Sequence, residues 1–110
     1  MRQYFDNWAA LVEAAPEKFK GINLRAWFNP GSETWIFDST EGPKLSRKNK
    51  LPERVGDDEV ILSGPSSAFE KVAKRTIVPA EALLNGELVI KGNPRAQLEL
   101  HKFFEVLLED

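Results

Sequence analysis

The sequence of 110 residues contains no cysteine and only one histidine, His101. Without cysteine, disulfides and thiolate chemistry are excluded. A lone histidine has no partner to complete a zinc site or a catalytic set, so we expect it to be structural or exposed. The acids show no calcium-loop spacing, and Gly86 and Gly92 match no phosphate-binding pattern. We therefore predict no metal site, no cofactor and no enzymatic activity.

Long apolar runs and an excess of basic residues are also missing. No stretch approaches the roughly 20 apolar residues of a membrane span. Asp6 and Glu13 interrupt the apolar pattern at the N-terminus, which argues against a signal peptide. The net charge of -2 argues against nucleic-acid binding. We expect one domain over residues 1–110, because no linker or repeat divides the chain. We expect it in the cytoplasm, because the sequence has no cysteine and shows no signal peptide.

The first half predicts one helix and the start of a sheet. Apolar residues recur at helical spacing over 4–15, and alternation over 22–28 indicates a strand. A second strand over 33–38 would complete a hairpin. Residues 44–54 fit either a third strand followed by a loop or a loop throughout. A short buried strand is expected over 59–63.

Within the first strand, Trp27 faces away from Leu24 and Ala26. We expect another element to cover it, most simply a helix, although an outward tryptophan also suits a contact between subunits.

The second half predicts helices at both sides of one more strand. A helix follows Ser67–Glu70, which matches a capping box. Pro79 suits the first turn of a short helix whose apolar face is Ala80, Leu83 and Leu84, and Gly86 suits its left-handed end. Residues 88–90 form a strand closed by Gly92. A last helix begins at the cap Asn93 and runs to about Leu108.

The last helix carries the broadest apolar face of the chain. Leu98 is expected to point outward, and Glu99, Lys102 and Glu105 to lie largely beyond the apolar face. Such a wide face suits plain core packing, and it also suits a helix that lines a pocket. The residues of this face, with Val106 at its flank, are Ala96, Leu100, Phe103, Phe104, Leu107 and Leu108.

Residues 82–93 resemble the sterol carrier protein type 2 family. The shared pattern is a small or apolar residue, a glycine, a short apolar strand, a second glycine and a polar cap. The chain departs from the family at residues 75–78, where a glycine is common, and at Asn93-Pro94, where an aspartate is common. The resemblance implies an α+β fold: a curved, mostly antiparallel sheet of about five strands, covered chiefly on one face by helices.

The resemblance also implies binding or transfer of a lipid or other apolar ligand, such as a fatty acid, an acyl-CoA or a sterol-like molecule, in a tunnel between sheet and helices. An empty pocket of roughly 300 Å³ would cost about 7 kcal/mol, as much as a small domain's whole stability. We therefore expect the unliganded tunnel to be filled, partly collapsed or loosely ordered. The residues expected to bind the lipid are Phe69, Leu83, Leu84, Leu88, Ile90, Leu100, Phe103, Phe104 and Leu107.

Two alternatives remain beside the carrier. The chain could be an accessory domain, perhaps dimeric, that presents its apolar groove to a partner protein. An enzyme acting on an apolar substrate is disfavoured, since no nucleophile and base occur together. The basic run Lys44–Arg54 suits an anionic headgroup, a CoA phosphate or a transient contact with an acidic membrane, or is simply a solvated loop.

Overall fold

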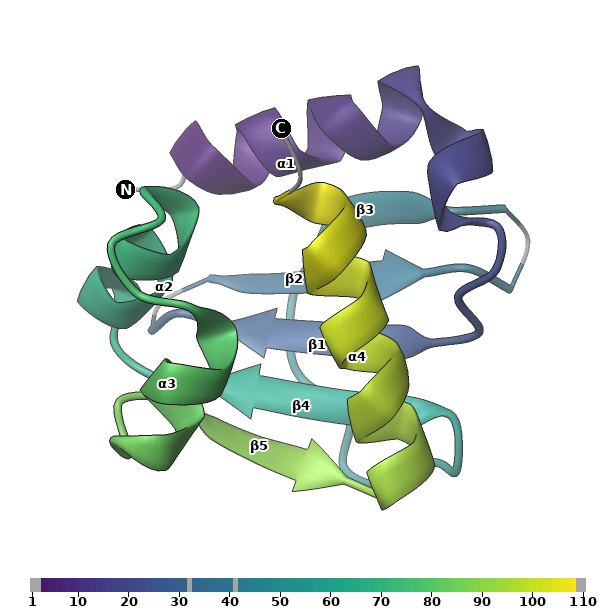
Figure 1. The fold of residues 1–110 in the computed structure, drawn as a ribbon. Coiled ribbons are helices and arrows are strands. Elements are labelled where there is room, and N and C mark those ends of the chain that lie inside the picture. The colour runs from purple at the N-terminus through teal and green to yellow at the C-terminus, as the bar shows by residue number, and fades with distance from the viewer. Residues whose placement is uncertain (1–2, 32, 41, 109–110) are drawn as a thin grey trace.

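The computed structural model describes residues 3–31, 33–40 and 42–108. It contains one five-stranded sheet and helices gathered on one of its faces (Figure 1). No helix in these ranges has the length and apolar character needed to cross a membrane. The elements in chain order are α1 (Gln3–Ala14), η1 (Pro16–Phe19), β1 (Arg25–Asn29), β2 (Thr34–Asp38), β3 (Lys44–Lys48), β4 (Glu59–Ser63), α2 (Ser66–Ala73), α3 (Pro79–Leu84), β5 (Val89–Gly92) and α4 (Pro94–Leu107).

The sheet is mixed and open, with the strand order β3-β2-β1-β4-β5. β1 and β4 pair in parallel at its centre, whereas the other three neighbouring pairs are antiparallel. In this register Ala26 of β1 lies between Phe37 of β2 and Val60 of β4. The predicted α+β class and the predicted count of strands are confirmed.

Alternation along the strands decides which side chains reach the helices. Leu24, Ala26 and Phe28 are buried on the helix side, while Arg25 is exposed on the other side. Residues 44–54 start with a strand, β3, and continue as a crossover without regular structure. Of the two interpretations that the sequence left open, the strand followed by a loop is the right one.

All four α-helices cover the same face of the sheet (Figure 1). α4 lies across the strands, α1 lies along the β3 side, and α2 and α3 lie together at one end. The core between the two layers is largely aromatic. The ring of Phe103 lies 4.4 Å from that of Phe37 and 5.8 Å from that of Phe28, and all three side chains are fully buried. Such ring contacts add stability beyond the area they bury.

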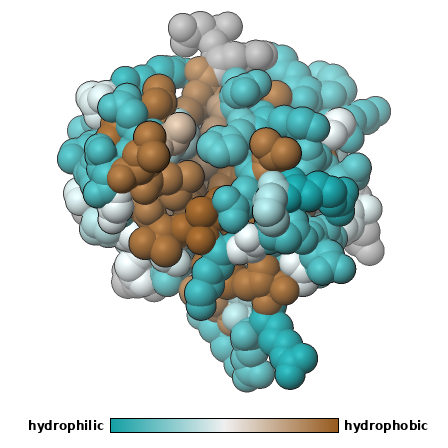
Figure 2. Space-filling model, turned by 60° about the horizontal axis from the view of Figure 1, so that its bottom comes forward, coloured by the Kyte–Doolittle hydropathy of each residue, from teal (hydrophilic) through white to brown (hydrophobic). Residues whose placement is uncertain are grey.

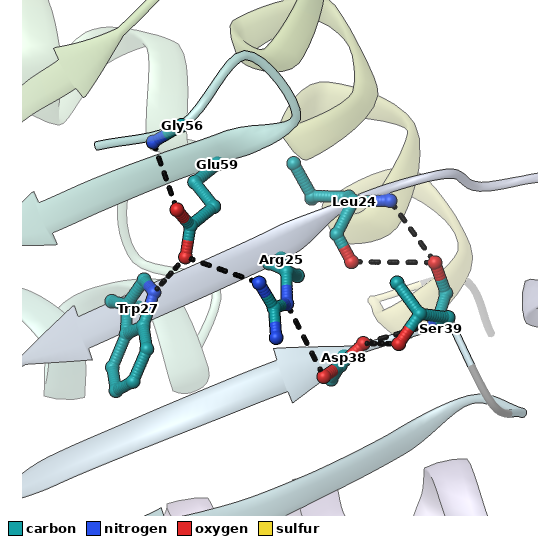
Figure 3. Close-up of polar contacts among 8 residues, drawn as sticks. Leu24, Arg25, Trp27, Asp38, Ser39, Gly56 and Glu59 are labelled. Carbon is teal, nitrogen blue, oxygen red and sulfur yellow. Dashed lines mark hydrogen bonds and ion pairs between the residues drawn. The ribbon is translucent and has the colours of Figure 1, made fainter. Parts of the chain in front are cut away.

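The opposite face of the sheet carries the crossover that leads from β3 to β4 (Figure 1). Its end is fastened by Glu59, whose carboxylate accepts hydrogen bonds from the Trp27 indole N–H at 3.0 Å and from the Gly56 backbone N–H at 2.8 Å (Figure 3). The Arg25 guanidinium lies 3.9 Å from the same carboxylate. The prediction that a helix covers Trp27 is therefore wrong. The helices of the described residues pack on the other face of the sheet (Figure 1), and the indole donates to the Glu59 carboxylate instead.

The predicted capping box at Ser67 is also wrong. α2 begins one residue earlier, at Ser66, and its N-cap position is Pro65, with no side-chain hydrogen bond to the cap. Glu70 instead pairs with Lys74 at 2.7 Å, one turn further along the helix. Because Pro65 occupies the N-cap position, Ser67 and Glu70 do not lie at the positions that a capping box requires.

Two helices, α2 and α3, end at a residue with left-handed backbone. Arg75, with φ of 61°, ends α2, and the Thr76 N–H donates to the Lys71 carbonyl at 3.0 Å. This is the Schellman arrangement, normally made with glycine. Gly86, with φ of 78°, ends α3 in the same way, as the sequence predicted.

Candidate functional site

The position of α4 relative to the sheet is set by polar contacts at its first two turns. The Asn93 side chain accepts a hydrogen bond from the Ala96 N–H at 2.8 Å, which confirms the predicted cap. Glu99, predicted to lie beyond the buried face, is in fact buried: its carboxylate accepts the Asn23 N–H at 3.0 Å and pairs with Lys102 at 2.7 Å. The hydrogen bond from Lys102, together with that from Asn23, holds the pKa of the Glu99 carboxyl below its usual range.

An apolar cavity lies where α3 and α4 meet the strands β4 and β5. Leu62 of β4 and Leu88, just before β5, face Leu83 of α3 and Leu100 of α4. The cavity measures only about 10 Å³, which is close to the space one water-sized probe needs. The space beneath α3 and α4 is therefore almost filled by side chains.

An open groove of about 310 Å³ lies directly above this cavity, between the start of α3 and the last turns of α4. Pro79, His101 and Phe104 line both the groove and the cavity, so these side chains form the partition between them. The groove is otherwise lined by Val78, Ala80, Glu105 and Leu108. Figure 2 shows apolar side chains gathered in a broad area of the surface, with smaller apolar areas beside it.

The structure separates the predicted ligand-binding residues into groups. Leu83, Leu88, Leu100 and Phe104 line the cavity. Phe69, Phe103 and Leu107 are buried in the core between the layers, while Ile90 is half-buried and outside the lining. Leu84 is 86% exposed and lines neither cavity nor groove.

The face of α3 was predicted incorrectly. Ala80 and Leu84 are exposed, and Ala82 is the residue that is fully buried. The Ala82 carbonyl accepts the N–H groups of Glu87 and Leu88, so the chain folds back tightly beneath this residue. A helix of six residues has too little periodic signal to show which side meets the core, and the turn that follows it decides.

Sequence reasoning missed several residues of the site. Leu62 looked like any core residue of a buried strand, and Pro79 was assigned only to starting a helix. His101, correctly placed at the border of the apolar face, lies in the partition between groove and cavity. Nothing in the sequence distinguishes these residues, because they are brought together by three separate elements. Within the described ranges no group of histidine and acidic residues could hold a metal ion.

A larger groove of about 470 Å³ lies at the other side of the molecule, between α1 and the beginning of β3. Its lining includes the charged residues Glu13 and Lys44, and it shares no residue with the cavity beneath α4. The smaller groove is the better candidate for an apolar ligand, because it leads to an apolar cavity.

Three solved structures show the same fold. Sterol carrier protein-2 like-3 from Aedes aegypti has a TM-score of 0.70 and 16% identity, covering 94% of each chain. The sterol carrier protein domain 2 of Helicoverpa armigera has a TM-score of 0.68 and 15% identity, covering 98% of this chain and 90% of that one. The palmitated SCP2L2 protein of Aedes aegypti has a TM-score of 0.67 and 19% identity, covering 99% and 95%.

No curated protein sequence matches this chain significantly. Residues 5–105, however, match the SCP-2 sterol transfer family, which is nearly the whole described fold. The fold, the layered arrangement of sheet and helices, and the pattern of residues 82–93 all agree with this match. The chain therefore belongs to the SCP-2 sterol transfer family.

Proposed function

We propose that the protein binds a single-chain lipid, such as a fatty acid, without chemically changing it. The tail would enter through the groove between α3 and α4 and occupy the space between Leu83, Leu88 and Leu100. The observation that carries this proposal is the adjoining groove and cavity, separated only by side chains that line both. The relative from Aedes aegypti described as palmitated supports a fatty acid as the first ligand to test.

Energetics favour moderate affinity. A tail of about a dozen methylenes offers roughly 10 kcal/mol of transfer free energy. Immobilising the tail offsets part of this gain. We therefore expect moderate affinity, and little selectivity for the headgroup because the tail supplies most of the binding energy.

The lipid would enter at the C-terminal end of α4. The first turns of α4 are held by Asn93 and Glu99, whereas its last turn is held by the hydrogen bond from the Arg75 Nε to the Leu108 carbonyl at 3.2 Å. Arg75 also precedes the residues that form the groove wall. Movement of the last turn of α4 away from α3 would therefore open the partition.

A pair of tryptophan substitutions on α3 tests this site. Ala80→Trp places a large ring in the groove, and Leu84→Trp places the same ring on an exposed position of the same helix outside the groove. We expect Ala80→Trp to bind dodecanoate at least about tenfold more weakly than the wild type, a loss of about 1.4 kcal/mol of binding energy. The affinity is measured by the displacement of a bound fluorescent fatty acid with dodecanoate. The second variant should behave as the wild type.

Circular dichroism and thermal unfolding would establish that both variants fold. Equal affinities of the two variants would place the lipid elsewhere. A wild-type protein that binds no fatty acid, sterol or acyl-CoA would refute the carrier function and favour the accessory-domain alternative.

A further inference from the structure

The helix-free face of the sheet carries a cluster of cations that the lipid site does not use. This cationic surface consists of Lys44 and Lys48 of β3 and Lys50 and Arg54 of the crossover. All four side chains are exposed, and none makes a hydrogen bond or ion pair with another residue in the described ranges. By contrast, Arg47 of the same strand pairs with Glu33 at 3.7 Å.

The register of the sheet places these cations together. Lys44 and Lys48 are two positions either side of Ser46, which pairs with Ile36, so both belong to the face away from the helices. Lys44, at the beginning of this edge strand, also borders the groove between α1 and β3. The crossover runs over that same face (Figure 1). The Glu59 carboxylate holds its end through the Gly56 N–H (Figure 3). This hydrogen bond fixes the end of the crossover that follows Arg54.

Among the described residues, no acid forms an ion pair with the cations of this surface. Asp38, opposite Lys44 in the sheet, is occupied by Arg25 at 3.5 Å and by hydrogen bonds from Thr40 at 2.9 and 2.6 Å. Glu53 is the one acid in residues 44–54, which contain five cations. The rest of the chain holds ten cations and sixteen acids, so this segment is positive on an otherwise acidic protein. Such separation of charge steers oppositely charged partners.

We propose that the cationic surface docks an acidic segment of a partner protein. A bilayer and a protein would offer similar charges, but their geometry differs. The lipid groove opens on the helix side of the sheet, so a bilayer held against the opposite face would leave the groove pointing away from the membrane. A protein held there leaves the groove open to exchange lipid. The choice between these partners rests on the proposed lipid site, whereas the docking surface itself does not.

The test compares two triple variants with the same change in net charge. Lys48→Gln, Lys50→Gln and Arg54→Gln neutralise the cationic surface. In the control, the substitutions are placed at exposed cations outside the strands and the crossover: Lys20→Gln, Lys74→Gln and Arg95→Gln. Fluorescence anisotropy of a fluorescein-labelled oligoglutamate peptide measures binding by both variants and by the wild type.

The wild type should bind the peptide with an affinity that falls as NaCl is raised, and the cationic-surface variant should bind at least about tenfold more weakly. The control should bind like the wild type. Equal binding by both variants, or no binding by the wild type, would overturn the proposal. So would tight binding of phosphatidylserine vesicles through the same residues, or self-association in light scattering that the cationic-surface variant abolishes. Dodecanoate binding should be unchanged in both variants, which keeps this test separate from that of the lipid site.

Discussion

Leu100 offers the sharpest test of how the closed cavity relates to lipid binding. Its side chain is 3% exposed and lines the cavity of about 10 Å³ beneath the groove. Leu100→Ala would enlarge this space by three carbon atoms. Truncating a buried leucine to alanine costs about 2 to 5 kcal/mol, so we expect a loss of about 3.5 kcal/mol. The melting temperature of a domain of this size should fall by roughly 15 °C.

The same substitution should strengthen lipid binding. About 2.4 kcal/mol of the loss is the transfer energy of three carbons, which leaves about 1 kcal/mol for the cavity itself. A lipid tail that enters the cavity recovers this last part, so dodecanoate should bind about fivefold more tightly. Chemical unfolding with and without dodecanoate measures both effects.

Leu98→Ala is the matched control on the same helix. Leu98 is 63% exposed, so its truncation should change stability by no more than about 0.5 kcal/mol and leave the affinity unchanged. If Leu100→Ala lost stability but bound dodecanoate no better than the wild type, the cavity would not be part of the lipid site. The reasoning that joins groove and cavity would then fail.

Three further predictions concern the frame around the site. Gly92→Ala should lower the free energy of unfolding, measured with urea, by about 2 to 4 kcal/mol. The reason is that φ is 144° and an added Cβ would lie 2.7 Å from the Glu59 carbonyl oxygen. A loss below about 1 kcal/mol would contradict this close approach. The pKa of Glu99 is lowered by its hydrogen bond from Lys102, so its contribution is complete above the unfolded-state pKa of about 4.3 and is lost as the pH falls through the lower folded-state value. Glu99→Gln should therefore reduce stability at pH 7 by about 1 kcal/mol and flatten the acid limb of the stability profile, and an unchanged limb would show that other carboxylates account for it. Arg75→Gly should be about 1 kcal/mol more stable than Arg75→Ala, since both lose the guanidinium but only glycine relieves the φ of 61°, and equal melting temperatures would show that the left-handed turn stores no strain.

Local signals in the sequence predicted most of the elements. The alternation around Ala26 and Phe28 identified β1 and its buried face, and the Asn93 cap placed the beginning of α4. Each of these signals acts within a few residues, through side-chain period or a single hydrogen bond. The motif at Ser67 shows the limit of this reasoning, since the helix begins one residue earlier, at Ser66, with Pro65 at its N-cap.

The candidate site was predicted only in part. Leu83 and Leu84 are indistinguishable as neighbours in a short apolar stretch, yet one lines the cavity and the other is exposed. The helical pattern predicts that Glu99 faces solvent, whereas in the structure its carboxylate accepts a hydrogen bond from the Asn23 N–H. Both assignments depend on segments that are far apart in the chain.

The sequence by itself determined that the chain has one apolar layer between a sheet and helices, since the periods of its apolar residues match strands and helices in turn. Only the tertiary structure decided that a small apolar cavity lies beneath α3 and α4, which residues separate it from the groove, and that Trp27 meets a carboxylate. These features arise where elements dock, and docking is governed by the shape and hydrogen-bonding needs of residues that no local pattern connects.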